Sequence, residues 1–99
     1  MAALPQEQVE SRLGEIAGWS LADGQLRREL KFKDFIESMT YVLKVAFHAE
    51  QADHHPDIAI SYSKVTLTLS THSEGGITDK DFALAKEINA IDAPVPQPS

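Results

Sequence analysis

The longest helical pattern in the chain runs over residues 34–56, with the sequence DFIESMTYVLKVAFHAEQADHHP. Asp34 is suited to cap the start of a helix, and Pro56 stops it because the residue before a proline avoids helical geometry. We therefore predict one helix from Phe35 to His54. The apolar residues that recur at steps of three and four are expected to form its buried stripe, and they are Phe35, Met39, Val42, Leu43 and Ala46.

The end of this helix is rich in titratable side chains. The predicted buried stripe continues into Glu50, Asp53 and His54, and His55 follows directly. Burying an unpaired carboxylate or imidazole is costly, so this pattern favours a polar pocket at the helix end. Glu50 lies one turn before His54 on the same helical face, and we expect it to orient that imidazole.

The residues before the long helix predict a short helix and a hairpin. Residues 5–17 carry apolar side chains at helical spacing, and Gly18 is suited to end that helix. Residues 19–21 and 25–32 are predicted to be strands, joined by a turn at Asp23 and Gly24.

The residues after the long helix repeat this order. Residues 58–62 and 65–69 alternate between apolar and polar side chains, which predicts two antiparallel strands with a tight turn near Ser63 and Lys64. Thr78 can cap a last helix. The order α-β-β-α-β-β-α predicts an α+β fold, a two-layer sandwich in which a four-stranded antiparallel sheet carries three helices on one face.

Composition limits the possible classes of protein. The chain has 99 residues, of which 42% are hydrophobic, with a formal net charge of -6 and no cysteine. We predict a single domain over residues 1–92 and a disordered proline-rich tail over 93–99. The negative charge disfavours nucleic acid as a partner, no apolar segment is long enough for a membrane span, and we expect a cytoplasmic protein. A sheet face or edge without cover favours a homodimer or homotetramer.

The titratable residues suggest acid–base chemistry. Two histidines beside two carboxylates, with His72 following the last strand, can give and accept protons near neutral pH. A solvated helix end, where histidines interact with the helix dipole, remains an alternative. A zinc site is another, but adjacent His54 and His55 are poorly spaced as ligands, so we expect no metal.

Seven of these positions resemble the pattern of the pterin-4a-carbinolamine dehydratase family. The pattern contains an acidic or polar residue, two histidines and a proline, followed at set distances by an aromatic residue, a histidine and an aspartate. In this chain the positions are Glu50, His54, His55, Pro56, Tyr62, His72 and Asp81. The resemblance implies a hydro-lyase that dehydrates a 4a-hydroxytetrahydropterin to the quinonoid dihydropterin during tetrahydrobiopterin recycling. The pterin would be the substrate, and no cofactor would be needed.

The resemblance also implies roles for individual residues. His54 and His72 would transfer protons, His55 would place the substrate and take part in catalysis, and Glu50 would hold or tune a histidine. Asp81 is expected to brace the His72 loop. The residues expected to contact the pterin beside these histidines are Asp53, Ser70, Thr71 and Ser73.

We make two further expectations, one about Tyr62 and one about an alternative function. Tyr62 is placed at the floor of the pocket. The alternative function is that of a small oligomeric regulatory or binding protein whose pterin site is vestigial.

Overall fold

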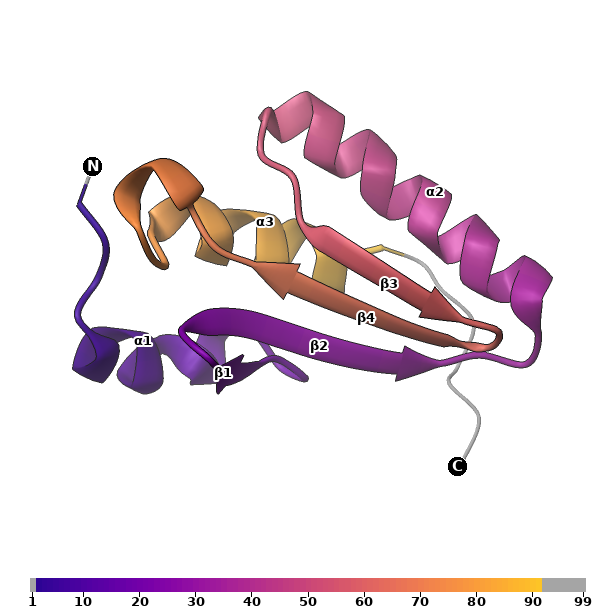
Figure 1. The fold of residues 1–99 in the computed structure, drawn as a ribbon, viewed down its shortest axis with the longest axis horizontal. Coiled ribbons are helices and arrows are strands. Elements are labelled where there is room, and N and C mark those ends of the chain that lie inside the picture. The colour runs from indigo at the N-terminus through magenta and orange to yellow at the C-terminus, as the bar shows by residue number, and fades with distance from the viewer. Residues whose placement is uncertain (1, 92–99) are drawn as a thin grey trace.

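The computed structural model describes residues 2–91, in which three α-helices accompany one four-stranded antiparallel sheet (Figure 1). The elements in chain order are α1 (Gln6–Arg12), β1 (Ser20–Ala22), β2 (Gln25–Lys31), α2 (Phe35–Ala52), β3 (Asp57–Ser61), β4 (Lys64–Leu69) and α3 (Asp79–Asn89). Short 3-10 helices span Leu13–Glu15 and His72–Glu74. The predicted α+β class and element order are confirmed. The predicted tail over 93–99 lies outside the described residues.

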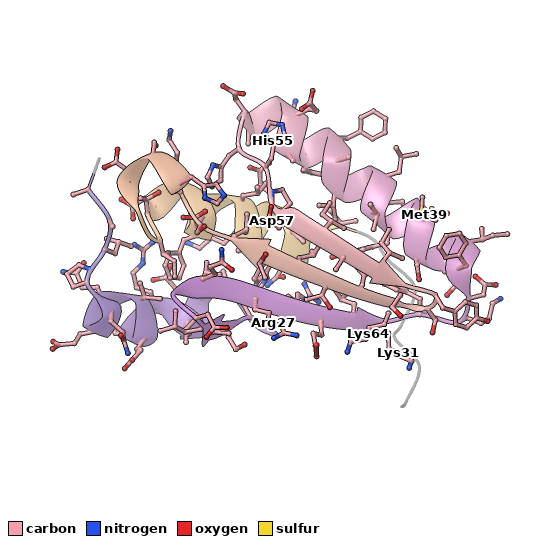
Figure 2. All side chains as sticks on the ribbon, viewed as in Figure 1. Arg27, Lys31, Met39, His55, Asp57 and Lys64 are labelled. Atoms are coloured by element: carbon pink, nitrogen blue, oxygen red, sulfur yellow. The ribbon has the colours of Figure 1, made fainter. Side chains whose placement is uncertain are left out.

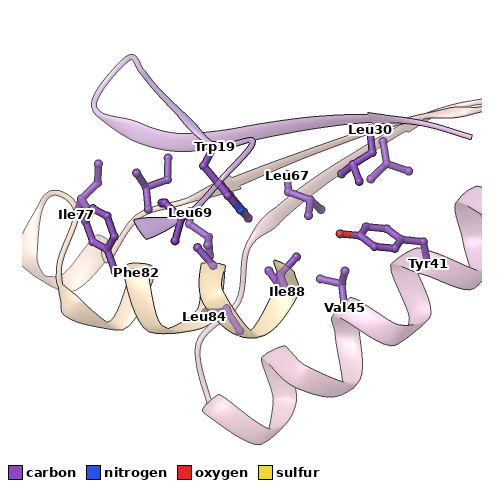
Figure 3. Close-up of a cluster of buried hydrophobic side chains, with 14 of the residues drawn as sticks. Trp19, Leu30, Tyr41, Val45, Leu67, Leu69, Ile77, Phe82, Leu84 and Ile88 are labelled. Carbon is purple, nitrogen blue, oxygen red and sulfur yellow. The ribbon is translucent and has the colours of Figure 1, made fainter. Parts of the chain in front are cut away.

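The sheet has the strand order β1-β2-β4-β3, so β4 is central and β3 is an edge strand. On β4, Val65, Leu67 and Leu69 are fully buried and alternate with half-buried threonines. This alternation directs one face of the sheet toward the helices, as a period of two requires. The hydrophobic core lies between that face and the helices, and it includes side chains from β2, β4, α2 and α3 (Figure 3).

The opposite face of the sheet is polar. Arg27 and Lys64, both labelled in Figure 2, come from two strands. They lie 2.8 and 3.4 Å from the carboxylate of Glu29. The hydrogen bond from Lys64 and the charges of both cations lower the pKa of the Glu29 carboxyl. Within residues 2–91 no helix is both long and apolar enough to span a membrane.

The buried face of α2 differs from the predicted one. Its buried residues are Ser38, Tyr41, Val45 and Ala49. Three residues of the predicted stripe are instead exposed, with relative exposures of 50% for Phe35, 44% for Met39 and 59% for Leu43. The prediction failed because α2 carries apolar residues on two faces, and periodicity alone cannot say which face meets the sheet.

Helix α2 also ends two residues earlier than predicted. Asp53 adopts a left-handed conformation with φ of 52°, and its N–H bonds to the carbonyls of Ala49 and Glu50. The N–H of His54 bonds to the Ala49 carbonyl at 3.1 Å. These bonds satisfy the last carbonyls of the helix and turn the chain away from it. His54 and His55 therefore lie outside the helix.

The predictions for the two hairpin turns had different outcomes. The turn at Asp23 and Gly24 is confirmed, since both residues have the positive φ that a tight hairpin turn favours. The second turn was predicted at Ser63 and Lys64 but lies at Tyr62 and Ser63, because Lys64 already pairs with Ser61 in the sheet. The first helix is shorter than predicted and ends at Arg12, where a 3-10 turn continues the chain.

Candidate active site

Antiparallel pairing of β3 and β4 brings two polar segments to one end of the sheet. Asp57, the first residue of β3, pairs with Thr68 near the end of β4. The segment 54–56 that enters β3 therefore lies beside the segment 70–72 that leaves β4. Figure 2 shows His55 near the end of α2, close to Asp57 at the start of β3.

Asp81 is the central residue of this region. It is fully buried in the first turn of α3, and its Oδ1 lies 2.5 Å from Nε2 of His54. The His54 side chain is only 12% exposed. A buried carboxylate needs partners, and a carboxylate that binds one ring nitrogen of a histidine fixes the tautomer of the ring.

The second carboxylate oxygen of Asp81 holds the start of the His72 loop. Oδ2 accepts hydrogen bonds from the Thr71 hydroxyl at 2.8 Å and from the Thr78 backbone N–H at 2.9 Å. Because the Thr71 hydroxyl has given its one proton to Asp81, the Thr78 hydroxyl donates to it at 2.8 Å. One buried carboxylate thus links His54 to the residue preceding His72. The bond to Thr71 lies where Asp81 was predicted to brace the His72 loop, and the bond to His54 was not predicted.

Glu50 has a different partner from the predicted one. Its Oε2 lies 2.5 Å from Nε2 of His55, and both side chains are exposed. The expected pairing with His54 required a continuous helix, and the left-handed conformation of Asp53 breaks that register. An exposed pair of this kind contributes little to stability, and its exposure leaves both side chains accessible from solvent.

His72 lies at the edge of a cavity of about 310 Å³. Ser70 and Gln25 share this cavity, whose remaining lining comes from the β1–β2 turn and the glycine pair Gly75 and Gly76. His54 and His55 are not part of its lining. Of the four residues expected to contact the pterin, Asp53 and Ser73 are exposed, Ser70 is half-buried and Thr71 is buried.

Within a single folded chain, Tyr62 does not lie near this region. It lies in the turn between β3 and β4, at the opposite end of both strands from His55 and Ser70, and it is 66% exposed. The expectation that Tyr62 forms the pocket floor is therefore wrong for a single chain. His48, for which no site role was predicted, lies 3.5 Å from Glu87 on α3.

Sequence reasoning missed three contributors to this region. The link from Asp81 to His54 had a partial signal, since Thr78 and Asp81 are spaced as a capping box. Asp23 and Gln25 at the β1–β2 turn had none, because only tertiary structure brings that turn to His72. Among the described residues, no group of three or more His, Cys, Asp or Glu side chains is arranged to hold a metal ion.

Comparison with protein families gives a match over nearly the whole chain. The family model described as pterin 4 alpha carbinolamine dehydratase matches residues 2–91. A protein of Mycolicibacterium vanbaalenii is 53% identical over 91 residues, which cover 92% of this chain and 98% of that protein. A protein of Sulfolobus acidocaldarius is 51% identical over 88 residues, which cover 89% and 97%. Both are provisionally named pterin-4-alpha-carbinolamine dehydratase.

Solved structures show the same fold. A crystal structure from Brucella melitensis, titled transcriptional coactivator/pterin dehydratase, has a TM-score of 0.83 at 36% identity and covers 89% of this chain and 96% of that one. A pterin dehydratase-like protein described as a RuBisCO assembly factor in the alpha-carboxysome has a TM-score of 0.58 at 19% identity, covering 73% and 83%. At that identity the likeness concerns the fold alone.

Proposed function

The chain belongs to the pterin 4 alpha carbinolamine dehydratase family, and on this premise we propose that it dehydrates 4a-hydroxytetrahydropterins by histidine acid–base catalysis. The observation that carries the proposal is the buried carboxylate of Asp81, which binds His54 and also Thr71, the neighbour of His72. This carboxylate joins two of the three histidines that the reaction would use to one rigid frame.

His54 is proposed as the general base. Because the Asp81 carboxylate can only accept, Nε2 of His54 carries a proton and Nδ1 is left with a free lone pair. Nδ1 can then take the proton from N5 of the pterin. Holding the ring by a buried partner keeps this nitrogen oriented without cost at the moment of reaction.

His72 is proposed as the general acid. It is exposed at the cavity edge, where it can protonate the hydroxyl group at C4a. The C4a–O bond breaks and water leaves, while the N5–H electrons form the double bond between N5 and C4a. Proton exchange with solvent then returns His54 to its neutral form and His72 to its protonated form. His55, with Glu50, would help to place the ring.

The proposed reaction needs neither a metal nor a redox cofactor, since it only moves protons and releases water. We place it in the cytoplasm, in tetrahydrobiopterin recycling after an aromatic amino-acid hydroxylase has turned over.

The test is the rate of dehydration of a freshly generated 4a-hydroxytetrahydropterin. His54→Ala and His72→Ala should each lower the rate by at least about tenfold, since one general acid or base contributes about 10²–10⁴-fold. His48→Ala, a histidine of α2 away from the site, is the matched control and should retain the full rate. Normal rates in either site variant would remove that residue from the mechanism.

A second candidate function is protein binding by a homo-oligomer. The observation that favours it is the outer face of α2, where Ile36 is 75% and Phe47 is 69% exposed. The Brucella melitensis relative also carries the word coactivator in its title. A stoichiometric protein partner together with no acceleration of pterin dehydration would favour this function over the enzyme.

A further inference from the structure

The cavity beside His72 continues into a larger one. The smaller cavity of about 310 Å³ contains His72, Ser70 and Gln25, and the larger one has a volume of about 600 Å³. The two share four residues, so they form one continuous groove, and the shared residues are Asp23, Gly24, Gly75 and Gly76. Three of the four are glycines, which leave this neck of the groove open.

The far part of the groove is lined by both apolar and polar side chains, with Gln6 and Glu10 among the polar ones. It lies between α1, β1 and the segment after the glycine pair, and its apolar lining is Leu4, Val9, Leu13, Leu21 and Ile77. The hydrogen bond from Leu4 N–H to the Ile77 carbonyl, at 2.7 Å, holds the N-terminal segment against this wall. A recess of this mixed lining, continuous with the cavity at His72, suits the outer part of a ligand whose reactive end lies at His72.

Apart from His72, the titratable side chains that line the groove are carboxylates. Asp23 lies at the neck and Glu10 at the larger cavity, whereas neither lining contains a lysine or an arginine. Glu10 is held in place by Gln6, whose side-chain amide donates to it at 2.8 Å. A ligand that carries carboxylates past His72 into the larger cavity would meet the negative charges of Asp23 and Glu10, and the lining of that cavity contains no lysine or arginine to offset them.

We infer that this groove receives the substituent at C6 of the pterin and that Asp23 and Glu10 select substrates whose C6 substituent is uncharged. The inference rests on the proposed function. In a pterin, C6 is bonded directly to N5, so its substituent leaves the ring beside the N5–C4a edge on which His54 and His72 act. Tetrahydropterins with short uncharged substituents fit the groove, and folates, whose substituent ends in glutamate carboxylates, are rejected.

The test measures dissociation constants for two probes, 6-methyl-7,8-dihydropterin and 7,8-dihydrofolate. The wild-type protein should bind the uncharged probe at least about tenfold more tightly, because the carboxylates of dihydrofolate would be repelled by those of Asp23 and Glu10. In Asp23→Asn/Glu10→Gln this preference should shrink at least fivefold. Asparagine tolerates the left-handed conformation of residue 23, so the turn is retained.

Glu7→Gln is the matched control, because it removes one negative charge from the same helix at a position outside the groove lining. It should leave the preference at the wild-type value. High salt should weaken the preference of the wild-type protein and leave that of the double variant nearly constant.

The outcomes separate the inference from the proposed function. Binding of both probes with the same ratio in the wild type and the double variant would overturn the inference alone. An equal loss of preference in Glu7→Gln would overturn it too, since net charge would then be the cause. Failure of both probes to bind would overturn the proposed pterin chemistry as well.

Discussion

The Asp81 carboxylate accepts three hydrogen bonds from three segments of the chain. These come from His54, Thr71 and Thr78, of which His54 precedes β3 and the two threonines flank the glycine loop. A fully buried carboxylate is compatible with a stable fold only when hydrogen-bond donors satisfy its oxygens. Here three donors do so. The same group therefore supports the fold and orients a proposed catalytic base.

Asp81→Asn should lower the rate of dehydration at least tenfold. The amide removes the charge and can donate to Nε2 of His54, which would move the imidazole proton to Nδ1. The ¹⁵N chemical shifts of the ring would report this exchange of tautomers, which a purely structural role would not produce.

Thr78→Ala is the control for that variant. It removes the cap of α3 and should lower the free energy of unfolding by about 1 kcal/mol. It should leave the His54 tautomer unchanged. If Asp81→Asn retained both the rate and the wild-type tautomer, Asp81 would have no positioning role.

Tyr41 gives a prediction about alkaline stability. Its hydroxyl is buried without a hydrogen-bond partner among the described residues, and burial raises the pKa of this side chain. Figure 3 shows the hydroxyl directed into the core. In the unfolded chain the pKa of a tyrosine is about 10. Above that pH the unfolded state loses a proton that the folded state keeps. The contribution of Tyr41 to the free energy of unfolding is therefore present below about pH 10 and is lost as the pH rises.

Urea unfolding at pH values from about 8 to about 11 checks this prediction. The free energy of unfolding should fall more steeply above about pH 10 in the wild type than in Tyr41→Phe. Tyr62→Phe, which changes the exposed tyrosine, should follow the wild type. Near neutral pH, Tyr41→Phe should be neutral or stabilising by about 1 kcal/mol, because it removes a buried hydroxyl without a partner.

At the scale of elements, the junction between α1 and β1 depends on one glycine. Gly18 has φ of 88°, and a Cβ added there would lie 3.3 Å from Nε of Arg28. Arg28 projects from β2 toward the helices, where its guanidinium donates to Asn89 of α3. Trp19 donates to the same oxygen at 2.9 Å. This cluster joins the two ends of the described chain.

Gly18→Ala should lower the free energy of unfolding by about 1–3 kcal/mol, because it adds left-handed strain and crowds Arg28. Gly14→Ala is the matched control, since a Cβ there meets nothing within 4 Å. It should be neutral or slightly stabilising. Thermal unfolding of the two variants checks the prediction, and equal melting temperatures would contradict it.

The elements also show how far the sequence determines the structure. Local signals were sufficient for the class, the order of elements, the Asp34 cap and the first hairpin turn. They failed for the buried face of α2, because two apolar stripes compete and only the sheet selects between them. They also failed for the pairing of His54, because the left-handed turn at Asp53 carries no strong sequence signal. The residue types of the candidate site were predictable, and their partners were not.

At the scale of the whole molecule, the outer face of α2 remains exposed. Side chains at steps of three and four along this face are Ile36, Met39, Leu43 and Phe47. So large an apolar stripe on one helix is typical of an interface. A second copy can present the same stripe, which is why we propose a homodimer or homotetramer.

Leu43→Glu should reduce the mass measured by sedimentation equilibrium, because it places a charge at the centre of the stripe. Ala83→Glu, which adds the same charge to an exposed position of α3, should retain the wild-type mass. A wild-type protein that sediments as a monomer would contradict the proposed assembly.

In the proposed mechanism, one pterin lies against His54, His55 and His72 together. The chain has four histidines, so His48 supplies an internal reference. The most direct measurement is a titration with 6-methyl-7,8-dihydropterin, followed through the imidazole ¹H–¹³C resonances. We expect saturable shifts of the three site histidines with a common dissociation constant and no shift of His48. Shifts confined to one segment, or to His48, would contradict it.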